Sequence, residues 1–508
     1  MFKSRHSLRS RILLILPIFI GAALHGEHAI RNVVLIHVDD LGWRDLGCMG
    51  SPVYETPHID RLAKEGMLFT NAYAAAALCT PARAGILTGA QPTRHGIYTV
   101  VKNRGTPELG KVIPLKNQHY FPKGYPTIAN VLTEAGIRNS SVGKWHLSTN
   151  PLDHGFEEQA HGGYSGMPMN YFAPFDLPYL PKDVEDGKFL AECLREAGVT
   201  FLEANRDKPF FLYFSTYLPH DRYTNEFDPN PLQAPQETVG KYRRKLQEMR
   251  RAKQDHGGHN NPFYAAMIEE TDNSVGVILD KLEDLELDRN TLVIFISDNG
   301  GQIEYTSNLP LRGEKNSLYE AGIRVPLIVR MPGKVAPGTI NHEPVTGFDI
   351  YPTLCTIFEV EPLEPDEVDG MDLSKVLFEG GSLGERNLLW NYPSHWWPLK
   401  EKGPRSALRR GDWKLHHFYS DNSFELYNLC DDIGESEDLS GKEPAMLARM
   451  KQQMAREYER FGAAKTLPVN PKYDEAAAND WLKANPPYPV PAKTSTEDAF
   501  KAIGWSTK

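Results

Sequence analysis

A single cysteine, Cys79, begins the segment CTPARAGILTG, and the residues that follow it indicate a reactive side chain. Pro81 suits the first turn of a helix, where its missing backbone N–H costs nothing. Cys79 would then lie at the helix N-terminus, where backbone amides favour an anion. Arg83, one turn further on, would point back toward the same place. Packing is the alternative interpretation, because free cysteine is among the most buried residue types.

Acidic and amide side chains follow two separate apolar runs. VVLIHVDD ends in Asp39 and Asp40, and TLVIFISDNGG contains Asp298 and Asn299. Such an all-oxygen set suits Ca²⁺ or Mg²⁺, whereas zinc prefers histidine or thiolate. Three carboxylates gathered at one sheet edge would also repel one another without a cation. The pattern predicts a hard divalent cation, the alternative being solvated acids at two unrelated turns.

Basic and imidazole side chains follow two more apolar runs. IRNSSVGKWH ends in Lys144 and His146, and FFLYFSTYLPH ends in His220. Continuous apolar, β-branched or aromatic runs are typical of strands buried on both faces of a parallel sheet. Ligands of such sheets bind beyond the carboxyl ends of the strands. We therefore expect the four strand ends to contribute to one site, although each histidine could also be a satisfied polar residue of the core.

Helical patterns alternate with these runs at 125–136, 188–206 and 267–285. The alternation predicts βαβ units and an α/β fold with a large, doubly wound, mostly parallel sheet flanked by helices. The basic stretch 241–254 favours a solvated helix. We assign residues 29–365 to this catalytic α/β domain.

The C-terminal part has a different pattern. DWKLHHFY and FELYNL, joined by SDNS, indicate an antiparallel hairpin, and 448–461 indicates a helix packed on it. We assign residues 366–465 to a subdomain with a small antiparallel sheet and a helix. Residues 466–508 are rich in proline, which predicts an extended tail on the surface. The five cysteines are too few and scattered for a disulfide scaffold, although the four besides Cys79 could form up to two bridges.

The first residues indicate export. Four basic residues within MFKSRHSLRSR precede the apolar run ILLILPIFIGAAL, which is shorter than the ~20 residues of a membrane span. We expect residues 1–28 to be a signal peptide and the protein to be periplasmic or extracellular, without stable membrane insertion; an uncleaved anchor is the alternative. The formal net charge of −10 over 508 residues argues against nucleic acid as a partner.

The segment CTPARAGILTG resembles the signature of type I sulfatases, formylglycine-dependent members of the alkaline phosphatase superfamily. In that family the cysteine of C-x-P-x-R is oxidised to formylglycine before folding, by a formylglycine-generating enzyme. Further segments resemble family blocks in the expected order: VVLIHVDDLGWRDLGCMG, ETPHIDRLAKEGMLFTNAYA, GKWHL, YLPH, SDNGG, LRGEKNSLYEAGIRVPLIVRMPG and ELYNL. The resemblance spans most of the chain.

The resemblance implies a role for each candidate residue. Formylglycine at position 79, hydrated to a gem-diol, would be the nucleophile, and Arg83 would steady it. One Ca²⁺ would be held by Asp39, Asp40, the residue at position 79, Asp298 and Asn299. Lys144 and Lys315 would bind sulfate oxygens, His146 would contact the diol, and His220 would protonate the leaving oxygen.

The function that follows is hydrolysis of sulfate monoesters, most simply on a sulfated carbohydrate. Such an ester needs charge stabilisation, an activated nucleophile and a proton for the departing oxygen. The alternatives are a phosphonate or phosphate ester hydrolase of the same superfamily and a non-catalytic binding protein on this scaffold. Glu314 stands where the family often has a small residue and could change substrate preference. Aromatic residues of SHWWP, 394–398, could stack on a sugar or pack between domains.

Overall fold

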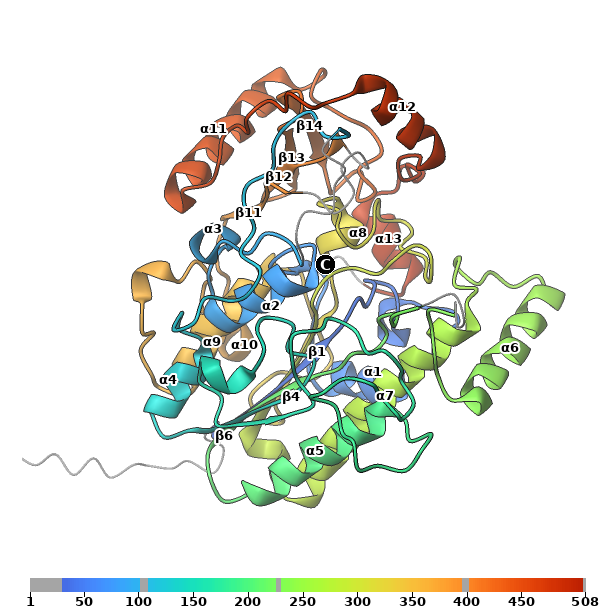
Figure 1. Cartoon of the computed structure of the whole chain (residues 1–508), viewed down its shortest axis with the longest axis vertical. Coiled ribbons are helices and arrows are strands. Elements are labelled where there is room, and N and C mark those ends of the chain that lie inside the picture. Colours follow the sequence, from blue (N-terminus) through green and yellow to red (C-terminus); the bar gives the residue numbers. More distant parts are fainter. Residues whose placement is uncertain (1–29, 101–107, 225–229, 395–401, 506–508) are drawn as a thin grey trace, which may run out of the picture.

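The computed structural model describes residues 30–100, 108–224, 230–394 and 402–505 (Figure 1). The expected signal peptide, 1–28, lies outside these residues, as do the aromatic residues of SHWWP. No helix of the described part is long and apolar enough to cross a membrane.

An eight-stranded sheet forms the centre of the large domain, in the order β5-β4-β6-β1-β7-β8-β2-β9. The four predicted strands are its middle: β4 (Arg138–Gly143), β6 (Phe210–Ser215), β1 (Asn32–Val38) and β7 (Thr291–Ser297). They pair in parallel, and β1, β6 and β7 are buried along their whole length. The prediction of a mostly parallel, doubly wound sheet is confirmed.

The remaining strands lie toward the edges of this sheet. β8 runs antiparallel to β7, and β2 runs antiparallel to β8. Their bounds are β5 Glu158–Ala160, β8 Leu327–Arg330, β2 Met67–Phe69 and β9 Thr339–Asn341. A separate two-stranded sheet pairs β3 (Ala72–Tyr73) with β10 (Val345–Thr346).

Helices cover both faces of the sheet because successive strand residues point to opposite sides. In β1, Val34 and Ile36 join one core cluster, and Val33 and Leu35 join the other. The first cluster is covered by α1 (Pro57–Glu65), α5 (Leu190–Ala204), α6 (Gln236–Arg251) and α7 (Pro262–Asp284). The second is covered by α2 (Cys79–Thr88), α4 (Ile128–Glu134), α9 (Ile350–Ile357) and α10 (Ser374–Glu379).

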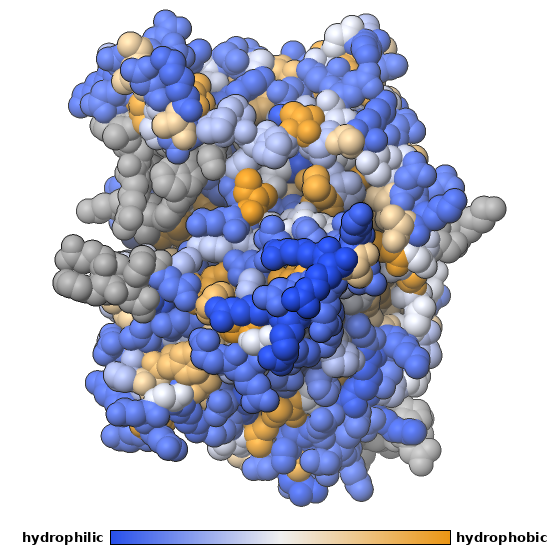
Figure 2. All heavy atoms as spheres, turned by 90° about the vertical axis from the view of Figure 1, so that its right-hand side faces the viewer, coloured by the Kyte–Doolittle hydropathy of each residue, from blue (hydrophilic) through white to orange (hydrophobic). Residues whose placement is uncertain are grey.

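Shorter helices complete the large domain. They are α3 (Pro92–His95), α8 (Glu320–Ile323) and the 3₁₀ turns Gly47–Met49, Pro151–His154, Asp288–Asn290, Gly347–Asp349 and Pro365–Glu367. Helix α6 lies at the right of Figure 1 and forms the strongly hydrophilic ridge on the face in Figure 2. The exposed side chains of Arg243, Arg244 and Arg251 agree with the expected solvated helix.

A four-stranded antiparallel sheet forms the C-terminal subdomain (Figure 1, top). Its strands are β11 (Asn387–Tyr392), β12 (Arg405–Arg410), β13 (Trp413–Phe418) and β14 (Ser423–Asn428). The predicted hairpin is β13–β14. The predicted helix is α11 (Pro444–Phe461), whose Met450 and Met454 pack in one cluster with Leu415 of β13. Although α10 falls in the range assigned to this subdomain, its Val376 packs in the core of the large domain.

The C-terminal tail differs from the extended chain that its prolines predict. It contains two helices, α12 (Glu475–Ala484) and α13 (Thr496–Ala502). Side chains just ahead of them, Asp474 and Ser495, accept hydrogen bonds from first-turn amides, which is the N-cap geometry that starts a helix. Phe500 of α13 then packs against Trp43, so the tail returns to the large domain.

Candidate active site

The ends of the four central strands bring the candidate residues together. Asp39 and Asp40 follow β1, and Asp298 and Asn299 follow its neighbour β7. Lys144 begins the loop after β4, where its backbone N–H donates to Ser215 O of β6 at 2.7 Å. His146 and His220 follow on the loops after β4 and β6. The expected convergence at the carboxyl edge of the sheet is confirmed.

Helix α2 begins at Cys79 and has Pro81 in its first turn, as expected. The Cys79 side chain is buried, with Sγ 3.5 Å from Asp39 Oδ1 and 3.9 Å from Asp40 Oδ1. Burial, and then the charge of Asp298, raise the pKa of this thiol. An unmodified Cys79 is therefore held in its protonated, weakly nucleophilic form.

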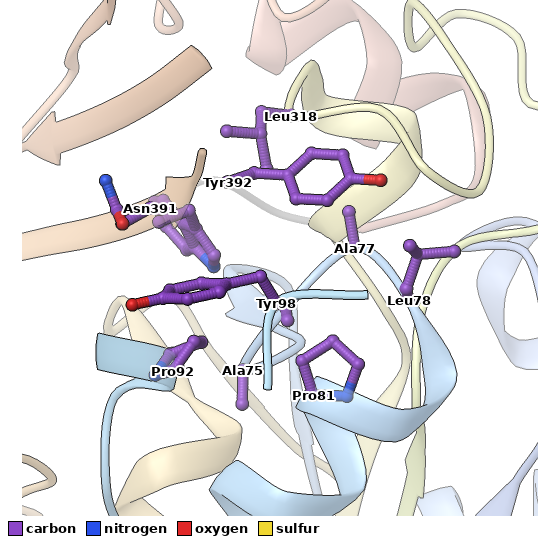
Figure 3. Close-up of a pocket in the computed structure, with 11 residues that line it drawn as sticks. Ala75, Ala77, Leu78, Pro81, Pro92, Tyr98, Leu318, Asn391 and Tyr392 are labelled. Atoms are coloured by element: carbon purple, nitrogen blue, oxygen red, sulfur yellow. The ribbon is translucent and has the colours of Figure 1, made fainter. Parts of the chain in front are cut away.

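Figure 3 shows a small void of about 10 Å³ beside the start of α2. Pro81 and Ala77 line it on the side of this helix, and Tyr98 and Tyr392 close it. Because this void has room for no more than about one water molecule, the mainly apolar side chains around it pack the first turn of α2. The site that includes Cys79 lies in a different cavity.

Arg83 is fully buried and connects three strand ends. Its Nε and Nη2 donate to Asp298 Oδ2 at 3.0 and 2.8 Å. Its Nη1 donates to the Lys144 carbonyl at 3.1 Å and to Ser215 Oγ at 2.5 Å. Burial works to raise the pKa of Asp298, but Arg83 and Lys144 outweigh it and lower that pKa, so this carboxyl group is ionised.

Two lysines pair with the carboxylates after β1. Lys144 Nζ donates to Asp39, and Lys315 Nζ donates to Asp40 Oδ2 at 2.6 Å. Burial works to lower the pKa of Lys315, but Asp40 outweighs it and holds that pKa well above its ordinary value. With Arg83 on Asp298, each of the three carboxylates has a cationic partner. Carboxylate repulsion by itself therefore does not require a metal ion, contrary to the sequence argument.

The donor atoms of the site nevertheless fit a hard cation. Ligand atoms of Asp39, Asp40, Cys79 and His220 all lie within 4.8 Å of one another. Asn299 Oδ1 is buried without a hydrogen-bond partner among the described residues, while its Nδ2 donates to Asp40 Oδ1 at 2.7 Å. A buried oxygen without a donor is a free ligand for a cation. Asp298 is outside this group, and His220 was predicted as a proton donor rather than a ligand.

His146 sits in a strained and crowded position. It has a φ of 56°, as does Asp40, in the left-handed region that non-glycine residues rarely adopt. Gly166 packs so closely on the imidazole that a Cβ there would lie 2.3 to 2.7 Å from ring atoms. Burial, then Lys144 and Arg83, hold the pKa of His146 well below its ordinary value, so the ring is neutral.

His220 lies between an acid and an ammonium. Its Nδ1 contacts the Asp221 carbonyl at 2.8 Å and Asp221 Oδ1 at 2.7 Å, and Tyr305 donates to the other Asp221 oxygen at 3.1 Å. Its Nε2 lies 2.8 Å from Lys315 Nζ and 3.4 Å from Asp40 Oδ2. Burial and Lys315 work to lower the pKa of His220, but Asp40 and Asp39 outweigh them and hold it well above its ordinary value.

The site opens into a cavity of about 710 Å³. Cys79, His146, His220 and Lys315 line it, whereas Lys144 and Arg83 lie fully buried behind it. Lining residues that the sequence analysis did not assign to the site include Tyr223, Gln302, Glu304, Asn485 and Tyr488. Gln302 Nε2 donates to Asp40 Oδ2 at 2.8 Å, and its place three residues after Asn299 could have identified it. Nothing in the tail sequence pointed to Asn485 or Tyr488.

Comparisons with known proteins agree with this geometry. A sulfatase family model matches residues 31–360, and a model described as N-sulphoglucosamine sulphohydrolase, C-terminal, matches residues 313–461. The N-acetylgalactosamine-6-sulfatase of Mus musculus is 31% identical over 466 residues, covering 85% of this chain and 80% of the relative. Arylsulfatase A of Homo sapiens is 30% identical over 488 residues, covering 83% and 86%. The chain belongs to the sulfatase family and is a sulfuric ester hydrolase of that family.

A solved structure agrees as well. The crystal structure of Ps i-CgsB in complex with k-i-k-neocarrahexaose matches with a TM-score of 0.68 and 26% identity. The match covers 90% of this chain and 98% of that one. It therefore includes both the large domain and the C-terminal subdomain.

Proposed function

We propose that this sulfatase removes sulfate from a sulfated carbohydrate, with formylglycine at position 79 and one Ca²⁺. The observation that carries the proposal is that Cys79, Lys315, His146 and His220 line one cavity, with the oxygen ligands beside them. The relatives support the substrate class, since one is named for N-acetylgalactosamine 6-sulfate and a neighbour was solved with a neocarrahexaose.

Charge stabilisation is the first requirement of the reaction. A sulfate ester is a poor electrophile until its oxygens are neutralised. Lys315, which reaches the cavity, and Lys144, behind Asp39, supply two ammonium groups at its inner end. Asp39, Asp40, Asp298 and Asn299 would hold Ca²⁺, which supplies Lewis-acid stabilisation of the sulfate oxygens.

The nucleophile is the second requirement. The raised pKa of Cys79 makes the unmodified thiol a poor one. A hydrated formylglycine would supply two hydroxyl groups. One would attack sulfur and displace the alcohol, and deprotonation of the other would break the C–O bond to the sulfate and re-form the aldehyde, which water hydrates again. The neutral imidazole of His146 accepts a proton from this residue, because its pKa is held low. Arg83 donates hydrogen bonds to the Asp298 carboxylate and to the Lys144 carbonyl, and so holds these two residues in position near residue 79.

The leaving alcohol is the third requirement. His220 donates a proton to the bridging oxygen as the S–O bond breaks, so that a neutral hydroxyl departs. Asp221 holds the Nδ1 side of the ring, so that Nε2 lies beside Lys315 where His220 lines the cavity. One water is consumed in each cycle, giving an alcohol, inorganic sulfate and a proton.

Two measurements test the proposal. Free sulfate is assayed after incubation with a panel of desalted sulfated saccharides and with matched phosphate and phosphonate esters. Mass spectrometry of the peptide containing residue 79 is carried out on protein made with the formylglycine-generating enzyme. We expect an aldehyde at 79 and release of sulfate from a saccharide. Faster hydrolysis of the matched phosphorus esters, or an active protein with an unmodified thiol, would contradict it.

We also propose that the enzyme works outside the cytoplasm, in the periplasm or medium. The support is the basic and apolar pattern of residues 1–28. N-terminal sequencing of the protein recovered from fractionated cells tests this. Recovery of the full-length chain from the cytoplasm alone would contradict it.

A further inference from the structure

One wall of the active-site cavity is built from two distant segments of the chain. Glu314 comes from the loop just ahead of Lys315, and Asn485 and Tyr488 come from the tail that follows α12. None of these three residues has a part in the reaction steps proposed above. They lie where the remainder of a substrate must sit once its sulfate group occupies the inner end of the cavity.

The Glu314 carboxylate is held in place from two sides. Its Oε2 accepts a hydrogen bond from the Ile303 backbone N–H at 2.9 Å. The Tyr488 hydroxyl forms a side-chain hydrogen bond with it. Burial and Glu314 together raise the pKa of Tyr488, so the phenol stays protonated and donates. A carboxylate fixed in this way is a preorganised element of the wall rather than a mobile surface acid.

Glu314 and Lys315 are adjacent in this loop, but their side chains contact different parts of the cavity wall. Lys315 directs its ammonium group inward, to Asp40 at 2.6 Å and His220 at 2.8 Å. Glu314 directs its carboxylate to Ile303 and Tyr488 instead. Asp221 and Glu304, which also line the cavity, add carboxylates. Among the described lining residues, Lys315 is the one lysine or arginine, and Asp221 is paired with His220. The described wall that carries Glu304 and Glu314 is therefore acidic, whereas the inner end with Lys315 is cationic.

We infer that Glu314, Asn485 and Tyr488 form a subsite for an uncharged sugar ring and disfavour a second sulfate or carboxylate beside the scissile sulfate. This inference rests on the proposed function. The Glu314 carboxylate can accept hydrogen bonds from sugar hydroxyl or N-acetyl N–H groups, and the Asn485 amide can both accept and donate them. A second anion on the substrate would meet the fixed Glu314 charge instead. Like charges a few ångströms apart in a partly solvated site weaken binding about tenfold or more.

The test compares two substrates that differ only in one charge. They are a hexosamine carrying a single O-sulfate and the same sugar with a second sulfate on the neighbouring carbon. We measure kcat and KM for both with the wild-type enzyme and with Glu314→Gln, whose amide oxygen can still accept from Ile303. We expect the ratio of kcat/KM, disulfated over monosulfated, to rise about tenfold in the variant, mainly through KM. Tyr488→Phe removes the hydrogen bond from Tyr488 to Glu314 and lets the carboxylate move away from the substrate. We expect this variant to raise the same kcat/KM ratio by a smaller factor.

The control is Glu134→Gln, which removes the same charge from the exposed end of α4, outside the cavity. Its ratio should equal that of the wild type. A folded, active Glu314→Gln enzyme with an unchanged ratio overturns the inference while the proposed function stands.

If no saccharide releases sulfate, the proposed function fails instead, and binding still tests the charge of the wall. Calorimetric Kd values for the two sugars are then measured with two proteins, Cys79→Ser alone and Cys79→Ser combined with Glu314→Gln. We expect the second sulfate to weaken binding to the protein that keeps Glu314 and to have a smaller effect in the double variant. An equal effect in both proteins shows that Glu314 does not discriminate by charge.

Discussion

Lys315 Nζ lies 2.8 Å from His220 Nε2. Because an ammonium group can only donate, this contact has Nε2 in its unprotonated, accepting form. Asp40 and Asp39, which hold the pKa of His220 well above its ordinary value, favour a proton on the ring instead. Protonation of Nε2 therefore requires Lys315 to move off this nitrogen, while it keeps its 2.6 Å contact with Asp40 or turns toward a bound anion. The two residues thus cannot both present a proton to each other. In the proposed reaction, a sulfate group that drew Lys315 to itself would free His220 to take up its proton.

Replacing Lys315 should damage both binding and catalysis. Lys315→Met keeps the aliphatic bulk but removes the ammonium group that pairs with Asp40. We expect kcat/KM to fall by about 10²-fold or more, because one charge that stabilises the transition state is lost. Inhibition by inorganic sulfate, the product, should weaken in parallel. Unchanged sulfate inhibition in a folded variant would show that Lys315 does not bind the anion.

A methyl group at Gly166 should move the His146 imidazole. In Gly166→Ala the new Cβ would lie 2.3 to 2.7 Å from three ring atoms, so the ring must shift. Misplacement of a reacting group by about 1 Å costs about 10²-fold in rate, and we expect a fall of that size in kcat. Gly240→Ala in α6, where a Cβ meets only an ordinary contact at 3.5 Å, is the control. Equal kcat values for the two variants would contradict this placement of His146.

Removing a divalent cation should lower both activity and thermal stability. A ligand present at about 100 times its Kd stabilises the folded state by about 2.7 kcal/mol. Dialysis against a chelator should therefore lower the melting temperature, and Ca²⁺ should restore it together with activity. Elemental analysis of the untreated protein should find one calcium per chain. Restoration by Zn²⁺ and not by Ca²⁺ would contradict the oxygen-ligand assignment.

Glu425 should make the free energy of unfolding depend on pH. It accepts hydrogen bonds from Tyr319 at 2.5 Å, Tyr427 at 2.9 Å and Lys402 at 2.9 Å. Burial works to raise its pKa, but Tyr319 and Lys402 outweigh burial and lower it to about 2. The folded state then holds this proton more weakly than the unfolded chain does. Glu425 therefore stabilises the fold above about pH 4.5, and this contribution is lost as pH falls toward 2.

Glu425→Gln tests that linkage. The contribution amounts to about 3 kcal/mol at most, because the pKa of Glu425 is about 2 in the folded state and 4.5 in the unfolded chain. We expect the variant to melt at a lower temperature than the wild type at pH 7 and the difference to shrink between about pH 5 and pH 3. Glu134→Gln, on the exposed end of α4, should follow the wild-type profile. A constant difference across this pH range would contradict the lowered pKa.

The strands and the residues at their ends could be predicted because both have local signals. Apolar runs mark β1, β6 and β7, whereas β4 reads RNSSVG and is buried despite its polar residues; each of the four strands stops where a polar side chain reaches the site. Parallel pairing then places those stops at one edge. The pairing of the carboxylates with Lys144, Lys315 and Arg83 could not be predicted, because it depends on side-chain geometry between segments far apart in sequence.

The tail could not be predicted for a related reason. Its prolines indicate extended chain, but the N-caps at Asp474 and Ser495 start helices between them. The contact of Phe500 with Trp43 joins the two ends of the described chain, and no local pattern encodes such a contact. Asn485 and Tyr488, which lie between these two helices, line the cavity.

The position of the C-terminal tail against the cavity also has a consequence for the order in which parts of the site form during synthesis. Residues 485 and 488 leave the ribosome about 400 residues after Cys79, so this wall of the cavity forms later in synthesis than the helix that carries Cys79. Cys79 emerges early and becomes buried only when the strands from 210 and 291 have joined the sheet. Nascent chains thus pass through an interval in which Cys79 is exposed and the wall at residues 485 and 488 is absent, and the proposed oxidation of Cys79 would have to occur in that interval.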